Sequence, residues 1–222
     1  MIFIFIKSLF LFKEKKDYFC YTNKNIKKLT INDMTKVFNK YLELEEIAIM
    51  RKWFLNNGVK REYSKDEYFV CEGDPSLYIG NIESGSFRYV KWTNKGQEQI
   101  VGYSFENDFV CDYGSFQTIT NAVVSAQAIR DSTVWVINYD QFNCFFNACG
   151  IDNLRSNISV LLLSDIYNRL LSLYVDSPEE RYLKLITNFP DILNLVNLKE
   201  VASYIRVTPE TLSRIRKRTS SK

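Results

Sequence analysis

Hydrophobic and polar residues follow three successive patterns along this chain, and these patterns predict helices, then strands, then helices again. Apolar residues from Met34 to Asn57 recur every three or four positions, which predicts one or two amphipathic helices. Short runs rich in Tyr, Phe, Val and Ile follow, separated by turn signals such as "EGDPS", "ESGS" and "TNKGQ". Because the runs "SFRYVKW" and "STVWVINY" alternate or nearly alternate in polarity, this middle region is typical of an antiparallel sandwich or jelly-roll barrel.

A helical pattern returns after Gly150 and extends for about six turns. Its apolar stripe consists of Leu154, Ile158, Leu161, Leu162, Ile166, Leu170 and Leu173. A helix of this length cannot bury its whole stripe against a small barrel, so we expect it to pair with its copy in a homodimer. A helix that folds back on its own domain is the alternative.

Two sets of helix-start signals follow. Ser177, Pro178 and Glu180 form a capping box with proline in the first turn, which predicts a new helix after a hinge. Asn197 and Glu200 repeat the capping pattern ahead of a shorter apolar period. The last part of the chain is therefore predicted to contain several separate helices.

The closing stretch "NLKEVASYIRVTPETLSRIRKR" is typical of a helix-turn-helix in its length, caps and apolar spacing. Arg206 and Val207 make the tight connection, and Thr208 caps the second helix. From Lys199 onward the chain carries seven basic and two acidic residues, a net charge of +5, whereas the preceding residues carry −2. A basic end on a nearly neutral body indicates a polyanionic partner.

We therefore expect the second helix to enter the major groove of double-stranded DNA, where Glu can accept from cytosine and Arg can bond guanine through two hydrogen bonds. The candidate DNA-binding residues are Thr208, Pro209, Glu210, Thr211, Ser213, Arg214, Lys217 and Arg218. Arg216 would add phosphate affinity that does not depend on sequence. The alternative is a generic helical hairpin whose basic face is solvated.

Composition excludes several kinds of chemistry. The chain has no histidine, which removes Ser-His-Asp and Cys-His catalysis, histidine-held zinc and histidine-ligated haem. Its five cysteines include no C-x-x-C pair, so we expect no metal site, and cysteines that act as small core residues in a reducing cytoplasm. No catalytic residue is assigned, and an enzyme is not expected.

The first residues, "MIFIFIKSLFLF", form an apolar run too short to span a bilayer, which takes roughly 20 residues. They lack the basic start and the small-residue cleavage site of a secretory signal. Residues 1–33 are expected to be a poorly ordered extension, so that the folded protein begins near Met34.

From about Met34 onward the chain resembles the Crp/Fnr family of bacterial transcription regulators, and its last segments are similar to members from Bacteroidetes-type bacteria. The resemblance runs through "YSKDEYFVCEGDPSLYIGNIESGSFRYV", "ENDFVCDYGSF", "SPEERYLKLI" and "LKEVASYIRVTPETLSRIRK". It implies an α+β protein with a double-stranded β-helix (jelly-roll) sensor domain and leading helices at residues 34–148. A dimerisation helix at 149–176 and a helix-turn-helix DNA-binding domain at 177–222 would follow.

By this resemblance, Pro209, Glu210 and Arg214 match the family's base-contacting positions. Arg206 stands where a glycine is usual, which strains the backbone by about 1 kcal/mol if its φ is positive. The chain stops at Lys222, so the β-hairpin wing that usually follows is expected to be absent. Its phosphate contacts would have to come from the basic tail.

In family members that bind cyclic AMP, a Gly-Glu pair contacts the ribose, and an Arg followed by a small hydroxyl residue contacts the phosphate. The resemblance places Cys111 and Asp112 at the first pair, Ala122 and Val123 at the second, and Tyr113 beside them. A buried phosphate without a cationic partner costs several kcal/mol. We therefore expect no tight cyclic AMP binding and no cofactor, and the effector is unknown.

The sequence thus predicts a homodimeric, sequence-specific transcription regulator in the cytoplasm. Its expected partners are double-stranded DNA, a second copy of the chain and, by the resemblance, RNA polymerase and an unidentified small molecule, but no membrane. One alternative is a cupin-like binding or catalytic barrel with an incidental basic hairpin, for which the absence of histidine is unfavourable. The other is a degenerate family member that no longer reads DNA.

Overall fold

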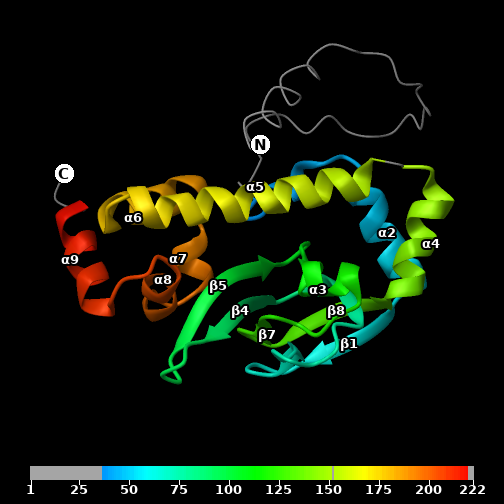
Figure 1. The fold of residues 1–222 in the computed structure, drawn as a ribbon, viewed down its shortest axis with the longest axis horizontal. Helices are drawn as coiled ribbons and strands as arrows, with labels where there is room; N and C mark the ends of the chain where they lie inside the picture. Colours follow the sequence, from blue (N-terminus) through cyan, green and yellow to red (C-terminus); the bar gives the residue numbers. More distant parts are fainter. Residues whose placement is uncertain (1–36, 152, 220–222) are drawn as a thin grey trace, which may run out of the picture. The chain divides into compact units, whose positions relative to one another are not determined.

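The computed structural model describes residues 37–151 and 153–219. The expected extension at residues 1–33, and the expected start of the fold at Met34, lie outside the described residues. Within the described parts, helices are followed by two antiparallel sheets and then by further helices, in the order that the polarity pattern predicts (Figure 1).

Two short helices precede the sheets, η2 (Lys40–Glu43) and α2 (Ile47–Asn57). Ile47, Met50 and Phe54 of α2 are buried at spacings of three and four residues, as in the predicted amphipathic pattern. They belong to a hydrophobic core that also contains Phe142 and Phe145, from the helix that follows the last strand.

The barrel consists of two four-stranded sheets. The first contains, in spatial order, β1 (Val59–Tyr63), β8 (Ser132–Asn138), β3 (Tyr78–Ser84) and β6 (Phe109–Val110). The second contains β2 (Tyr68–Val70), β7 (Ser125–Ala128), β4 (Ser86–Trp92) and β5 (Glu98–Phe105). Every neighbouring pair is antiparallel, which confirms the antiparallel architecture expected from the alternating polarity.

Alternate residues of several strands form a second hydrophobic core, inside the barrel. Ile82 of β3, Phe87 of β4 and Val134 of β8 are fully buried there. Gly85 makes the sharp turn between β3 and β4 with a φ of 98°. A side chain at this position would be strained and would collide with Ser132, so the turn requires glycine.

The helices of the barrel are α3 (Tyr113–Thr118) and α4 (Tyr139–Cys149). The helices after it are α5 (Leu154–Val175), α6 (Pro178–Asn188), α7 (Ile192–Leu195), α8 (Leu198–Tyr204) and α9 (Pro209–Thr219). Both predicted capping boxes are confirmed. Ser177 and Glu180 exchange hydrogen bonds at the start of α6, and Asn197 and Glu200 do so at the start of α8.

The apolar stripe of α5 serves two surfaces rather than one. Leu154 and Ile158 are buried in the same core as α2, and Leu161 and Leu162 pack against that core. These four residues were expected in a dimer contact together with the rest of the stripe. They instead pack within the chain, because the first turns of α5 cover its own aromatic residues.

The second half of α5 leaves large apolar side chains exposed. Leu163 is 67% and Ile166 is 65% exposed, and Leu170 and Leu173 follow on the same side of the helix. These four residues have the 3-4-3 spacing of a and d positions in a coiled-coil heptad. Leu163 was absent from the predicted stripe, although its spacing from Ile166 would have identified it.

Length and hydropathy alone would also allow α5 to cross a membrane, since an 18-residue window has a mean hydropathy of 1.3. Two polar residues of α5 are nevertheless bonded to the folded unit. The Asp165 carboxylate accepts the backbone N–H of Lys40 at 3.2 Å, and Arg169 donates to the Val101 carbonyl. The middle of α5 is therefore anchored to the same body as the barrel.

Candidate nucleic-acid interface and sensor loop

A four-residue connection (205–208) joins α8 to α9 and sets the angle at which α9 leaves. Arg206 has a φ of 61°, so the backbone strain that the sequence suggested is present. The Val207 N–H donates to the Ala202 carbonyl at 2.9 Å and closes the turn. Ala202 is fully buried, and a larger side chain there would hold the two helices apart.

The helix α9 separates its residues into an inner and an outer face. Leu212 and Ile215 are buried against the other C-terminal helices. Seven of the predicted DNA-binding residues are exposed and share the outer face: Thr208, Pro209, Glu210, Ser213, Arg214, Lys217 and Arg218. Thr211 is half-buried, and its N–H donates to the Thr208 hydroxyl at 3.2 Å, so it supports the cap rather than the outer surface.

This face carries one acidic residue, Glu210, near the start of α9 and basic residues farther along the helix. Hydrogen bonds from its own backbone N–H and from the Thr208 hydroxyl hold the pKa of Glu210 below its ordinary value, and Arg214 nearby acts in the same direction. Glu210 is therefore a hydrogen-bond acceptor at neutral pH. Arg218 lies 3.6 Å from Glu179 of α6 but its side chain remains largely exposed.

The loop between β6 and β7, with α3 inside it, holds the predicted ligand-pocket residues. The Asp112 carboxylate accepts the Val123 N–H at 2.7 Å, the Ser115 hydroxyl at 3.0 Å and the Ser115 N–H at 3.5 Å. Asp112 is buried, Ala122 is buried as well, and the Val123 side chain points outward with 59% exposure. The carboxylate of Asp112 is thus used to close its own loop.

Three basic residues of the barrel, none in this loop, are bonded within the protein. Arg88 pairs with Glu98 and Glu200, and Arg130 donates to the Leu195 carbonyl at 2.6 Å. Lys91 does reach the loop, because its ammonium donates to the Val123 carbonyl at 2.7 Å. It also pairs with Glu72 at 2.5 Å.

Lys91 lies beside Val123 because strand β4 pairs with β7, although the two strands are far apart along the chain. Its charge is already matched by Glu72.

The remaining pocket residues do not form a reactive centre. Burial, followed by Asp112 and Asp108, raises the pKa of the Cys111 thiol well above its ordinary value, which keeps the sulfur protonated and unreactive. Burial likewise raises the pKa of Tyr113. Across residues 37–151 and 153–219, no group of three or more Cys, Asp or Glu side chains is placed to hold a metal ion.

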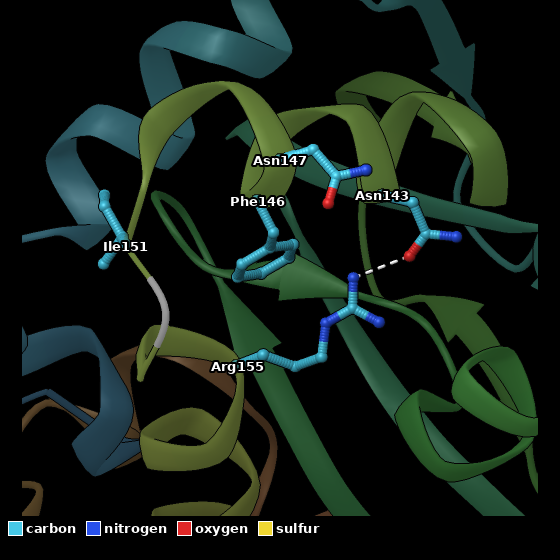
Figure 2. Close-up of a pocket in the computed structure, with 5 residues that line it drawn as sticks. All are labelled: Asn143, Phe146, Asn147, Ile151 and Arg155. Carbon is cyan, nitrogen blue, oxygen red and sulfur yellow. Dashed lines mark hydrogen bonds between the residues drawn. The ribbon is translucent and has the colours of Figure 1, made fainter.

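A separate hollow of about 490 Å³ lies where α4 ends and α5 begins (Figure 2). It is lined by Asn143, Phe146, Asn147, Ile151 and Arg155. The Arg155 guanidinium donates to Asn143 at 2.6 Å, stacks on Phe146 at 4.5 Å from its centroid, and reaches Gln117 of α3 at 3.2 Å. The arginine thereby joins α3, α4 and α5, and this structural role accounts for its position.

Comparisons with known proteins agree with this arrangement of barrel, long helix and C-terminal helices. The cyclic nucleotide-binding domain family matches residues 60–149, from within β1 to the end of α4. The fumarate and nitrate reduction regulatory protein of Yersinia pestis is 27% identical over 172 residues. Electron transport regulator A of Shewanella oneidensis is 26% identical over 171 residues. In both cases 70% of this chain is covered, and the chain spans 66% of the relative's length.

The chain is similar to regulators of the Crp/Fnr type.

Solved structures of the Crp/Fnr fold extend the likeness beyond the barrel. FixK2 from Bradyrhizobium japonicum superposes with a TM-score of 0.61 at 20% identity, over 74% of this chain and 85% of its own. The c-di-GMP-responsive regulator CLP of Xanthomonas campestris gives a TM-score of 0.62 at 18% identity, over 78% and 92% of the two chains. The two antiparallel sheets thus have the jelly-roll fold of the cyclic nucleotide-binding domain, as predicted. The named relatives are transcription regulators rather than enzymes.

Proposed function

We propose that this protein is a homodimeric, sequence-specific DNA-binding transcription regulator that acts in the cytoplasm. The observation that carries the proposal is the outer face of α9. An ionised Glu210 and an exposed Arg214 lie one helical turn apart near the start of a helix whose other face is buried. A helix with these properties fits the major groove, where its first residues reach base edges.

Each residue of this face has a distinct expected role. Glu210 accepts a hydrogen bond from a cytosine amino group, and Arg214 bonds the O6 and N7 atoms of a guanine. Thr208 and the N-terminal end of α9 contact a phosphate. Lys217 and Arg218 add affinity for the backbone that depends on salt rather than on sequence.

The exposed half of α5 supports a symmetric dimer. Leu163, Ile166, Leu170 and Leu173 offer a heptad seam that a second copy would cover. A two-fold dimer presents two copies of α9, so the preferred site is an inverted repeat with half-sites about 34 Å apart. RNA polymerase is a further expected partner for a regulator of this kind.

The barrel is not expected to be a cyclic AMP sensor. The Val123 N–H already binds the Asp112 carboxylate, and Lys91, which reaches this loop, is paired with Glu72. A cyclic phosphate in this loop would meet a like charge and no free cation, which weakens binding by roughly a thousandfold or more. The effector would then be a molecule of another kind, and we name none.

Millimolar cyclic AMP should therefore leave the unfolding temperature of the purified protein unchanged. Differential scanning fluorimetry measures this directly, with inorganic phosphate at the same ionic strength as the control for general anion effects. A saturable rise with cyclic AMP and none with phosphate would contradict the prediction, because a ligand that binds the native state must stabilise it.

DNA recognition is tested by selecting bound sequences from a random duplex library and then measuring affinities for the enriched site. Arg214→Ala should weaken specific binding by about tenfold to a hundredfold, since one bidentate arginine–guanine contact is worth about 1–3 kcal/mol. Low-salt binding to an unrelated duplex should change little. Lys52→Ala, which removes an exposed cation from α2, is the matched control.

The assay also separates this proposal from a degenerate regulator. Failure to enrich any sequence, with binding to every duplex lost on adding salt, would mean that α9 supplies charge but reads no bases. An enriched inverted repeat whose recognition is unchanged by Arg214→Ala would leave DNA binding in place and refute the role of Arg214.

A further inference from the structure

The C-terminal helices share one hydrophobic core with strand β5 of the barrel. Ile100, Tyr103 and Phe105 of β5 are buried in the same cluster as the apolar residues of α6 to α9. Phe38, ahead of the first helix, packs its ring 5.4–5.8 Å from four aromatic rings: Tyr103, Phe105, Phe189 and Tyr204. Non-directional packing of this kind brings the two parts together but does not set their angle.

A buried ionic cluster gives the contact a defined geometry. Arg88 of β4 donates to Glu200 of α8 at 2.9 Å, pairs with Glu98 at 3.0 Å, and donates twice to the Gln127 oxygen at 2.7 and 3.0 Å. The side chains of Arg88 and Glu200 are only 17% and 8% exposed. A buried arginine–carboxylate contact of this type is directional, because the planar guanidinium fixes where each acceptor must lie.

Glu200 has two tasks at once. One of its oxygens receives Arg88, and the other receives the Asn197 N–H at 3.3 Å in the capping box of α8. The carboxylate that starts α8 is therefore the same group that attaches α8 to the barrel. The start of α8 cannot shift relative to β4 without losing one of these two bonds.

Gln99 of β5 makes a second directional contact, at the other end of α8. Its amide nitrogen donates to the Ser203 carbonyl, and its oxygen accepts the Arg206 guanidinium at 2.7 Å. The Ile100 N–H also donates to the Ser203 hydroxyl at 3.0 Å. Arg206 is the residue with positive φ in the connection to α9. The barrel thus holds the turn whose geometry decides where α9 points.

We propose that β4 and β5 hold the α8–α9 pair in the orientation that reads DNA, with Arg88 and Gln99 as positioning residues. The inference rests on the proposed function. The bonds from the barrel engage α8 and the turn, whereas the outer face of α9 stays exposed. When α8 and α9 are docked on the barrel, the outer face of α9 therefore remains accessible to DNA. Loss of this docking should weaken DNA recognition rather than strengthen it.

The test compares Gln99→Ala with Gln97→Ala, the same change two residues earlier at an exposed position of the same hairpin. Gln99→Ala should weaken binding to the selected site by about fivefold to tenfold, within the range that such indirect contacts modulate. Low-salt binding to an unrelated duplex should stay within about twofold. Gln97→Ala should behave like the parent in both assays.

Arg88 is tested by a double-mutant cycle. Arg88→Met leaves Glu200 buried without its partner, whereas Glu200→Gln keeps the capping box and removes the charge. Arg88→Met should weaken specific binding by about tenfold, and Arg88→Met with Glu200→Gln should be no weaker than Arg88→Met alone, because the two residues act through each other. Additive losses would refute the coupling.

Hydrogen exchange of the α8 amides provides a readout that needs no DNA. Exchange should be faster in Gln99→Ala than in Gln97→Ala, because the docked α8 is then held by fewer bonds. Equal exchange would refute the docking. Faster exchange with unchanged or tighter specific binding would refute the positioning role. If the parent selects no sequence, the DNA-binding proposal fails, and the exchange comparison still decides the docking.

Discussion

Ile166→Glu should convert the proposed dimer into a folded monomer. Ile166 lies at the centre of the exposed heptad seam, and in a symmetric dimer its side chain would meet the seam of the partner copy. Glutamate removes roughly 2 kcal/mol of apolar burial per copy and places two like charges close together, so the dissociation constant should rise by about a thousandfold or more. Sedimentation at micromolar concentration would measure the halved mass.

The matched control is Asn168→Glu, which adds the same charge to an exposed position on the other side of α5. Its mass should equal that of the parent. Because Ile166 is exposed in the folded chain, its replacement should leave the circular dichroism spectrum and the unfolding temperature of the monomer intact. A dimer that survives Ile166→Glu would place the interface elsewhere. A parent chain that partitions into membranes would assign the seam to lipid instead.

The stability of the protein should depend on pH through Asp108. Its carboxylate is fully buried and accepts the Tyr41 hydroxyl, the Asn39 amide at 2.6 Å and the Phe109 N–H at 2.6 Å. Desolvation outweighs these bonds and raises its pKa from 3.8 to about 6. Arg51 of α2 lies within electrostatic reach but does not reverse this direction.

The sign of the effect follows from proton binding. Between pH 4 and pH 6 the native state keeps the Asp108 proton while the unfolded state loses it, so stability falls as pH rises through this window. The difference in unfolding free energy between the parent and Asp108→Asn should therefore decrease by about 2 kcal/mol from pH 4 to pH 7. Urea denaturation at each pH measures it.

Asp74→Asn is the control for this series, because Asp74 is an exposed carboxyl in a turn of the barrel. It shows what the loss of an exposed carboxyl group alone does to the stability curve. A parent curve that runs parallel to that of Asp108→Asn would mean that Asp108 titrates as an ordinary exposed acid. The three hydrogen bonds to the Asp108 carboxylate would then have compensated for the cost of its desolvation.

Features that depend on neighbouring residues were predictable from sequence. The capping boxes at Ser177 and Asn197 involve groups three residues apart, so local chemistry determines them. The strands were predictable because one side of each sheet is buried, which imposes an alternating pattern. The fold of the barrel and the starts of α6 and α8 followed from these signals.

Features that depend on contacts between distant segments were not predictable. Arg88 and Glu200 are 112 residues apart, and nothing local to either residue identifies the other. The prediction that the whole apolar stripe of α5 forms a dimer contact was partly wrong for a related reason. The sequence identifies an apolar helix but does not show which side of it packs against the core of its own chain. Asp112 was expected to face a ligand, and only the loop geometry revealed that it binds the Val123 N–H.

Glu200 both caps α8 and binds Arg88 of the barrel, and this limits which chimeric proteins can be made from the chain. A chimera that attaches its C-terminal helices to a different sensor barrel would carry Glu200 into a strand environment lacking Arg88, and would bury an unpaired carboxylate at the start of α8. Grafts of α8 and α9 should therefore transfer the β4–β5 hairpin with them, so that the natural unit of exchange includes part of the barrel as well as the C-terminal helices.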